Sequence, residues 1–311
     1  MRKTIMRGGL FALALLALGA CKSSEPETAA DASAADDDGI RVLDAGDRPR
    51  SELRYHYTGG ETNTSTTTFK VASLATSGDK AAVTLLPGLR LDIVSGPAQV
   101  TDRGVRVPVD VVKAEAVIPP GFDKALAEDL RAGATVAEDI GGWVELDMRG
   151  QVLAGELNER TKQAGVPIRL VRMIVNTRET LTRVKLPEEK VGLGARWETR
   201  GEIVAYGFKV QQVNTYTLVD IAGDDVMLDV TVQQFAKPQT ISFPEQGIEI
   251  SVEAMGAKAE GQIILDLAAL ESDATASGVA EDKLLVKTVD GTEMIDIFEE
   301  FEIQIANTSA M

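Results

Sequence analysis

The sequence predicts a fold of the α+β class that is mostly antiparallel β, with two or three helices. Apolar and polar residues alternate with a period of two in residues 226–232, 248–252 and 301–305, which is typical of strands with one covered face. Turn sequences such as Gly223-Asp224 separate these segments, which favours antiparallel hairpins over βαβ units. Hydrophobic residues make up 44% of the 311 residues, so we expect a globular body of one large domain or two modest ones.

Residues 1–20 resemble a bacterial lipoprotein signal peptide. A basic tip precedes an apolar run over residues 10–18, and Leu18-Gly19-Ala20-Cys21 is similar to a lipobox. The run is shorter than the ~20 apolar residues that span a bilayer. The resemblance implies that cleavage leaves Cys21, the single cysteine, as a lipid-modified first residue. By resemblance to enterobacterial lipoprotein sorting, Lys22 after it favours an outer-membrane protein facing the periplasm. An ordinary secretory signal or an uncleaved anchor remains an alternative.

Residues 21–39 are predicted to be the lipidated cysteine and a disordered, acidic linker. The segment has six acidic residues, one lysine and no large apolar side chain, a composition that cannot build a core. The whole chain has a formal net charge of −16. Such a charge repels nucleic acid, so we expect no nucleic-acid partner.

Two β-rich halves are predicted, residues 40–186 and residues 187–311. The first half is expected to contain helices near residues 120–133, ended by Gly133, and near residues 167–178, with a further short helix around residues 157–163. In both halves a strand, a Gly-Asp turn and a second strand follow one another, at Gly78 and at Gly223. This order indicates a diverged duplication, although any two antiparallel meanders share such features.

A glycine-containing motif joins the two halves. Its residues are Pro187, Val191, Gly192, Gly194, Ala195 and Trp197. The third glycine of a dinucleotide fingerprint and the Gly-Lys-Ser/Thr of a phosphate loop are missing. We therefore interpret the motif as a linker that turns and then buries the tryptophan.

This motif, with the Thr-Tyr-Thr-Leu strand at 215–218 and the opening Leu53-Arg54-Tyr55-x-Tyr57, resembles a family of uncharacterised bacterial lipoproteins that is defined as a domain of unknown function. The similarity covers most of residues 50–306. The family has no established activity or site residues. By analogy its architecture resembles the half-barrels of the LolA/LolB type, which implies curved sheets with helices across the concave side.

No catalytic, cofactor or metal signature is found, so we expect a protein that is not an enzyme. The single histidine, His56, lies between two tyrosines on a strand and has no nucleophile elbow to serve. One histidine and one lipidated cysteine cannot build a common zinc site. A hydrolase using acidic residues such as Glu145, Asp147 or Asp229 is the weakest alternative, and Glu299, Glu300 and Glu302 are interpreted as a solvated face.

Two functions remain open for a membrane-anchored envelope lipoprotein. Strands rich in Val, Ile and Leu with few helices to cover them predict a concave apolar face that binds a lipid or another hydrophobic ligand. The alternative is a scaffold whose exposed edge strands bind an envelope protein.

Overall fold

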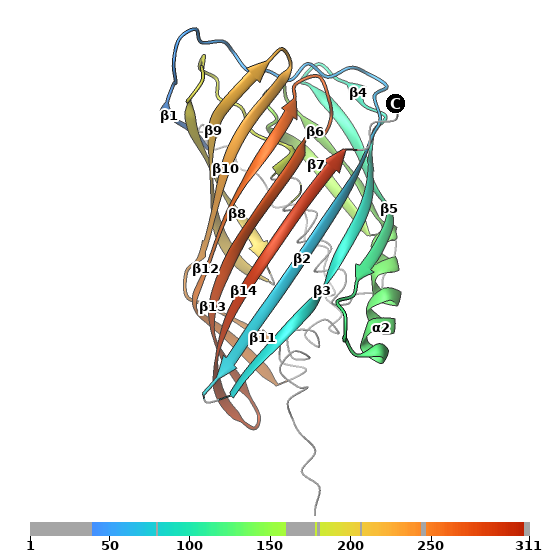
Figure 1. Cartoon of the computed structure of the whole chain (residues 1–311), viewed down its shortest axis with the longest axis vertical. Helices are drawn as coiled ribbons and strands as arrows, with labels where there is room; N and C mark the ends of the chain where they lie inside the picture. The colour runs from blue at the N-terminus through green and yellow to red at the C-terminus, as the bar shows by residue number, and fades with distance from the viewer. Residues whose placement is uncertain are drawn as a thin grey trace, which may run out of the picture.

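A computed structural model describes residues 39–78, 80–159, 178, 181–205, 207–243 and 247–307. These residues form one large, curved, antiparallel sheet that does not close on itself (Figure 1). The prediction of a mostly antiparallel β fold is therefore confirmed. The structure has one continuous sheet where the sequence suggested more than one.

Most strands are long, and few of the described residues are helical. The strands are β1 (Ile40–Asp44), β2 (Asn63–Ser77), β3 (Lys80–Ser95), β4 (Gln99–Val100), β5 (Val105–Val117), β6 (Ile140–Leu146), β7 (Val152–Glu159), β8 (Arg196–Ala205), β9 (Phe208–Ala222), β10 (Asp225–Ala236), β11 (Gln239–Phe243), β12 (Ile248–Asp266), β13 (Asp273–Thr288) and β14 (Gly291–Asn307). Among the described residues, the helices with given bounds are α2 (Lys124–Thr135) and the short 3-10 helix η2 (Val136–Asp139), and Arg178, Leu181 and Thr182 are helical as well.

The sheet combines two meanders. Its order is β1-β8-β9-β10-β12-β13-β14-β2-β3-β5-β6-β7, with β11 beside β12 and β4 beside β5. The last strand, β14, pairs with β2 over residues 296–307 and 65–76, which joins strands from the two ends of the chain. The turn at Gly223 connects β9 to β10, and Gly78 lies between β2 and β3, as the sequence predicted.

The helix predicted near residues 120–133 is present, but its bounds differ from the prediction. α2 begins at Lys124 and continues through Gly133 to Thr135. Gly121 has a φ of 81°, a conformation that belongs to a turn before the helix and not to the helix itself. Glycine inside a helix costs only ~1 kcal/mol relative to alanine, so Gly133 does not end it.

The other helix predictions fall mainly outside the described residues. Of the helix near residues 167–178 only Arg178 is described, and it is helical. The short helix around residues 157–163 cannot begin at Leu157, because β7 extends to Glu159. The signal peptide, Cys21 and the acidic linker also lie outside the described residues, apart from Gly39.

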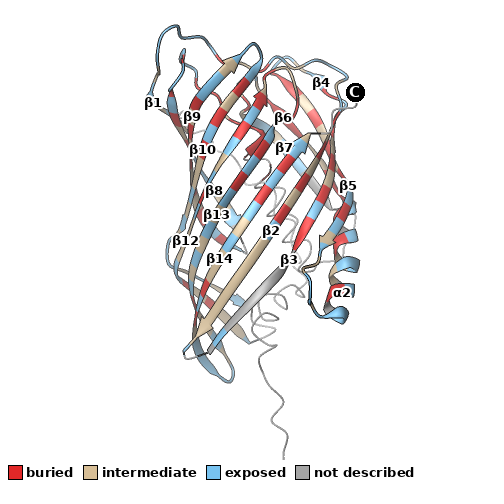
Figure 2. Cartoon of the chain, viewed as in Figure 1, coloured by how far each residue is buried: buried red, intermediate tan, exposed pale blue. Residues whose placement is uncertain are grey.

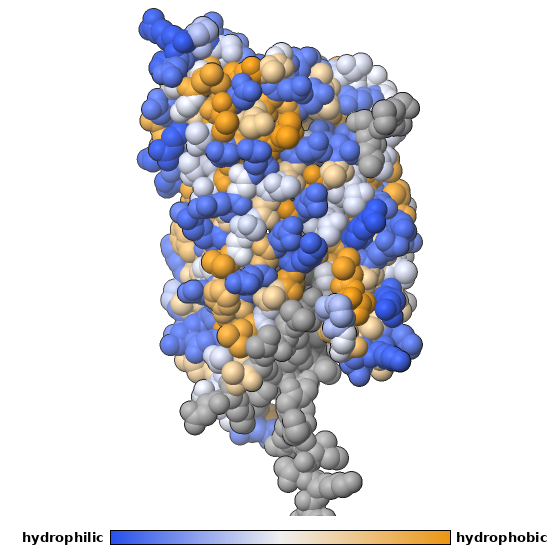
Figure 3. Space-filling model, in the orientation of Figure 1, coloured by the Kyte–Doolittle hydropathy of each residue, from blue (hydrophilic) through white to orange (hydrophobic). Residues whose placement is uncertain are grey.

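One face of the sheet carries the core. Buried and exposed residues alternate along the strands (Figure 2), as period-two side-chain geometry requires. A large core cluster, which we call the upper core, includes Ile303, Ile263 and Leu228. A smaller cluster, the lower core, lies at the other end of the same strands and includes Ile297, Leu284 and Val252. The outer face shown in Figure 3 is mostly hydrophilic, with small hydrophobic patches.

The segment after β1 crosses the end of the sheet above the upper core (Figure 1). It pairs with the glycine-containing motif of residues 187–197 through a bridge between Ser51 and Val191. Tyr55 donates its backbone N–H to the Met148 carbonyl, and His56 donates its backbone N–H to the Leu267 carbonyl. These bonds connect distant parts of the sheet and cover the upper core from above.

Candidate functional site

The inner face contains a cavity of about 150 Å³ between the upper and lower cores. Strands β2, β8, β9, β10, β12, β13 and β14 contribute its wall. The described lining is mostly apolar and includes Phe69, Val71, Val232, Met255 and Phe301. An apolar cavity of ~150 Å³ in another protein stays dry and binds benzene, so this space can hold a short stretch of hydrocarbon.

Small side chains on β12 and β13 create this space. Ala257 and Ala259 line the cavity from β12, and Ala276 and Ala280 line it from β13. Gly278 lies in the same row, where a Cβ would overlap the backbone of β12. Gly278 is therefore required because β12 and β13 approach each other closely at this point. Ala257 and Ala280 are only half-buried.

A row of polar side chains borders the cavity on β8, β9 and β10. Gln234 donates to the Gln212 amide oxygen at 2.7 Å, and Gln212 donates to Asn214 at 3.1 Å. Asn214 in turn donates to the Thr199 hydroxyl at 3.2 Å. Burial raises the pKa of the neighbouring Tyr216 to about 12, although its hydrogen bonds with Thr199 and Asn214 act to lower it. These bonded groups form a satisfied polar border.

Two carboxylates interrupt the apolar wall on the opposite side of the cavity. Asp282 on β13 and Glu299 on β14 both line it, and they are diagonal neighbours because Ala280 pairs with Glu299. Burial and the Glu299 charge raise the pKa of Asp282 to about 7. Burial also raises the pKa of Glu299, while a hydrogen bond with Ser73 lowers it.

The sequence reasoning missed these carboxylates. Glu299 was grouped with Glu300 and Glu302 as a solvated face, but only the latter two lie on the outer face. The sequence does contain a signal for this. Glu299 lies two residues after Ile297 and two before Phe301, so it shares the sheet face of these apolar side chains.

A buried ionic cluster lies in the upper core. The Arg178 guanidinium pairs with the Glu271 carboxylate, and both side chains are fully buried. Ser95 donates to Glu271, and Arg178 donates to the Ser65 hydroxyl at 2.9 Å. Arg183 lies 3.8 Å from the same carboxylate. The cluster joins β2, β3 and the chain before β13, which indicates a structural role.

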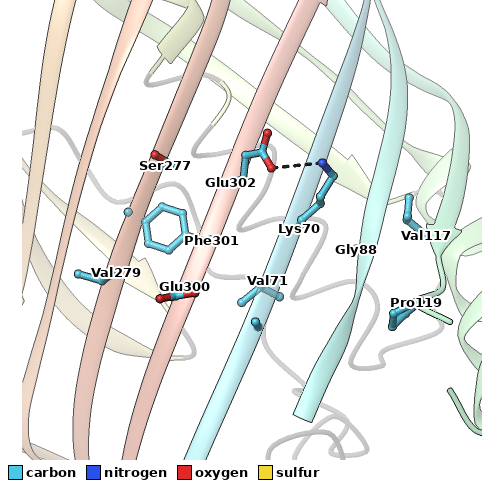
Figure 4. A pocket seen from close by; sticks show the side chains of 12 residues that line it. Lys70, Val71, Gly88, Val117, Pro119, Ser277, Val279, Glu300, Phe301 and Glu302 are labelled. Carbon is cyan, nitrogen blue, oxygen red and sulfur yellow. Dashed lines mark hydrogen bonds and ion pairs between the residues drawn. The ribbon is translucent and has the colours of Figure 1, made fainter. Parts of the chain in front are cut away.

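A groove of about 630 Å³ lies on the outer face over β13, β14, β2 and β3 (Figure 4). Lys70 pairs with Glu302 across it at 3.2 Å, and Val279, Val117 and Pro119 line it. Both charged side chains are more than half exposed. An exposed ion pair contributes only ~0–1 kcal/mol, so the groove offers no strong anchoring group.

The residues of the glycine-containing motif at 187–197 have structural roles. Val191, Ala195 and Trp197 are fully buried, and Pro187 is buried as well. The Trp197 indole N–H donates to the Lys185 carbonyl at 3.0 Å. Gly192 has no room for a Cβ beside the Asp47 carbonyl, and Gly194 has a φ of 76°. The motif is thus a linker that turns and buries a tryptophan, as the sequence predicted.

The acidic residues and the histidine considered for catalysis have local roles. His56 lies 3.3 Å from Asp224 with both side chains exposed. Glu145 binds Arg103 at 2.9 Å. Asp147 accepts backbone N–H groups in a turn, and Asp229 accepts from a glutamine on the next strand. The structure does not assemble them around a common point.

Comparison with known proteins gives no relative, because no family model and no curated protein matches the chain. Within the described ranges, no group of three His, Cys, Asp or Glu side chains is placed to hold a metal ion. None of the helices that the structure describes has the length and apolar character needed to cross a membrane.

Proposed function

We propose that the protein is a lipid-anchored envelope protein that binds a hydrophobic ligand, such as an acyl chain, on the inner face of its curved sheet without catalysis. The observation that supports this proposal is the apolar cavity between the two cores. Typical ligand pockets measure ~300–1,000 Å³, so the cavity would hold part of a chain and not a whole lipid.

The architecture proposed here is a half-barrel of two duplicated halves, similar to the LolA/LolB type and to the family of uncharacterised lipoproteins. Its support is the pair of meanders, each containing a hairpin around a Gly turn, at β2–β3 and at β9–β10. The anchor on Cys21 rests on the lipobox alone, and it would place the sheet at the periplasmic side of the outer membrane.

The binding test measures an acyl-chain fluorophore titrated into the purified, delipidated protein. Saturable binding with a fixed stoichiometry supports the proposal. Ala257→Leu adds three carbon atoms to the cavity wall and should displace about three methylenes of the ligand. At ~0.8 kcal/mol per methylene, the affinity should fall about 50-fold.

The matched control is Ala306→Leu, the same change at an exposed position of β14. Its affinity should equal that of the unmodified protein. Unfolding midpoints of both variants show whether the fold is retained. The proposal fails if the fluorophore does not saturate, or if Ala257→Leu folds and binds as tightly as the control.

A partner-binding scaffold is the second candidate. The strands β1 and β7 end the sheet order, and Val152 and Leu153 on β7 are exposed hydrophobic residues. Such an edge can pair with an extended peptide. Crosslinking in the native envelope through a photoreactive residue at Val152 tests this function: a single protein adduct supports it, and adduct-free protein contradicts it.

A further inference from the structure

One side of the cavity carries carboxylates, and these groups indicate which class of amphiphile the cavity accepts. Phe69, Val71 and Phe301 give it apolar surface. Beside them, Asp282 and Glu299 offer two carboxylates on adjacent strands. Diagonal neighbours on an antiparallel pair are ~7 Å apart, a separation that one small cation can bridge.

Asp282 lacks a counter-charge among the described residues. It makes no ion pair or hydrogen bond there, and the charged group that acts on it is another carboxylate, Glu299. Its partner across β12 is Met255, and Glu299 faces Ala280 on β13 and Ser73 on β2. A half-buried carboxylate beside a like charge is costly unless a cation or a proton accompanies it.

We propose that the cavity binds a cationic amphiphile, with an ammonium group between Asp282 and Glu299 and a hydrocarbon tail against Phe301 and the alanine rows. This inference rests on the proposed function and narrows its ligand class. The charge complementarity distinguishes a long-chain amine from a fatty acid, whose carboxylate would meet two like charges. A neutral long-chain alcohol would fill the apolar part without using the carboxylates.

Three probes of equal chain length test the inference: n-dodecylamine, n-dodecanol and dodecanoate, each competing with the acyl fluorophore at pH 8. The amine stays protonated at this pH. It should bind roughly 10- to 100-fold more tightly than the alcohol, the range that a hydrogen bond to a charged group supplies. Dodecanoate should bind most weakly.

Variants separate the carboxylates from the cavity. Asp282→Asn and Glu299→Gln should each reduce amine affinity about tenfold or more and leave alcohol affinity unchanged. Glu300→Gln is the matched control, because it removes the same charge from the exposed outer face of β14. The amine preference should also decrease as the pH falls from 8 to 5, because protons then neutralise the two carboxylates.

The outcomes distinguish the two proposals. If alcohol and amine bind equally, or dodecanoate binds best, the ligand-class inference is wrong while hydrophobic binding stands. If the amine preference survives in both Asp282→Asn and Glu299→Gln, the carboxylates do not hold the head group. If none of the probes displaces the fluorophore, or the fluorophore itself does not bind, both proposals are wrong.

Discussion

Replacing Glu271 by glutamine should be one of the most destabilising isosteric changes in this protein. Glu271 is fully buried and pairs with Arg178, whose side chain is fully buried as well. The variant keeps the shape and an oxygen for the Ser95 hydroxyl, but it removes the negative charge. Breaking a buried ion pair by removing one partner costs ~3–5 kcal/mol, because the other charge remains in the interior.

This cost converts into a measurable shift. For a folded body of this size, 1 kcal/mol corresponds to about 2 °C in Tm, so Glu271→Gln should lower the Tm by about 6–10 °C. Urea unfolding, followed by the fluorescence of the two tryptophans, Trp143 and the buried Trp197, gives the free energy directly. Glu300→Gln on the outer face should change the free energy of unfolding by ~0.5 kcal/mol or less. A loss of under 1 kcal/mol for Glu271→Gln would refute the reasoning.

The difference in the free energy of unfolding between wild type and Glu271→Gln should depend on pH with a defined sign. Burial acts to raise the pKa of Glu271, but the guanidinium charges of Arg178 and Arg183, with hydrogen bonds from Arg178 and Ser95, outweigh it and lower the pKa. A carboxylate with a lowered pKa stabilises the folded state above its unfolded pKa, and this stability is lost as the pH falls through the folded value. The gap between wild type and Glu271→Gln should therefore be full at pH 7 and shrink in acid.

Three further changes test other parts of the structure. Gly192→Ala should destabilise the protein although its φ is not positive, because a Cβ would overlap the Asp47 carbonyl; urea unfolding measures the loss. Trp197→Ala should cost ~3–5 kcal/mol, as for other large-to-small changes of fully buried aromatics, and is measured by thermal unfolding followed by circular dichroism. Asp282→Asn should become more stable relative to wild type as the pH rises from 4 to 8, by at most about 4 kcal/mol. The sign follows because the folded pKa of Asp282 is raised to about 7, so wild type loses stability over this range; parallel urea curves at pH 4, 6 and 8 that keep a constant gap would contradict it.

Local features of the fold could be predicted from the sequence. Strands such as β10 and the end of β14 follow from period-two alternation, and the β9–β10 hairpin follows from the Gly223 turn. Burial of Trp197 follows from a tryptophan that begins a strand after a turning linker. Each of these depends on residues close in the chain, where propensity and patterning carry the information.

Long-range features could not be predicted in this way. The pairing of β14 with β2 connects residues more than 200 positions apart, and alternation alone does not specify which strands are partners. The Arg178–Glu271 pair could not be predicted either, because a buried charge cannot be recognised in the sequence until its partner is known. α2 began later than expected because Gly121 adopts a turn conformation that the Pro-Pro-Gly sequence leaves undetermined.

The candidate site could have been found in part. Asp282 and Glu299 occupy the apolar phase of otherwise regular strands, and an acidic residue in that phase contradicts the pattern for a packed core. Such local violations of consistency are expected at functional positions. The sequence could not show that Asp282 and Glu299 lie on adjacent strands and face the same cavity.

The inner face is suboptimal for stability in two independent ways, and both occur at the same place. Larger side chains at Ala257 and Ala280 would fill the space between the cores, and apolar residues at 282 and 299 would avoid desolvating two carboxylates. Stability alone favours both replacements. Buried apolar clusters lie at the two ends of these strands, and the cavity lies between them. The proposed ligand, with a hydrocarbon tail and a cationic group, would account for both features at once, since it would supply the apolar contacts and the counter-charge that the described residues do not supply there.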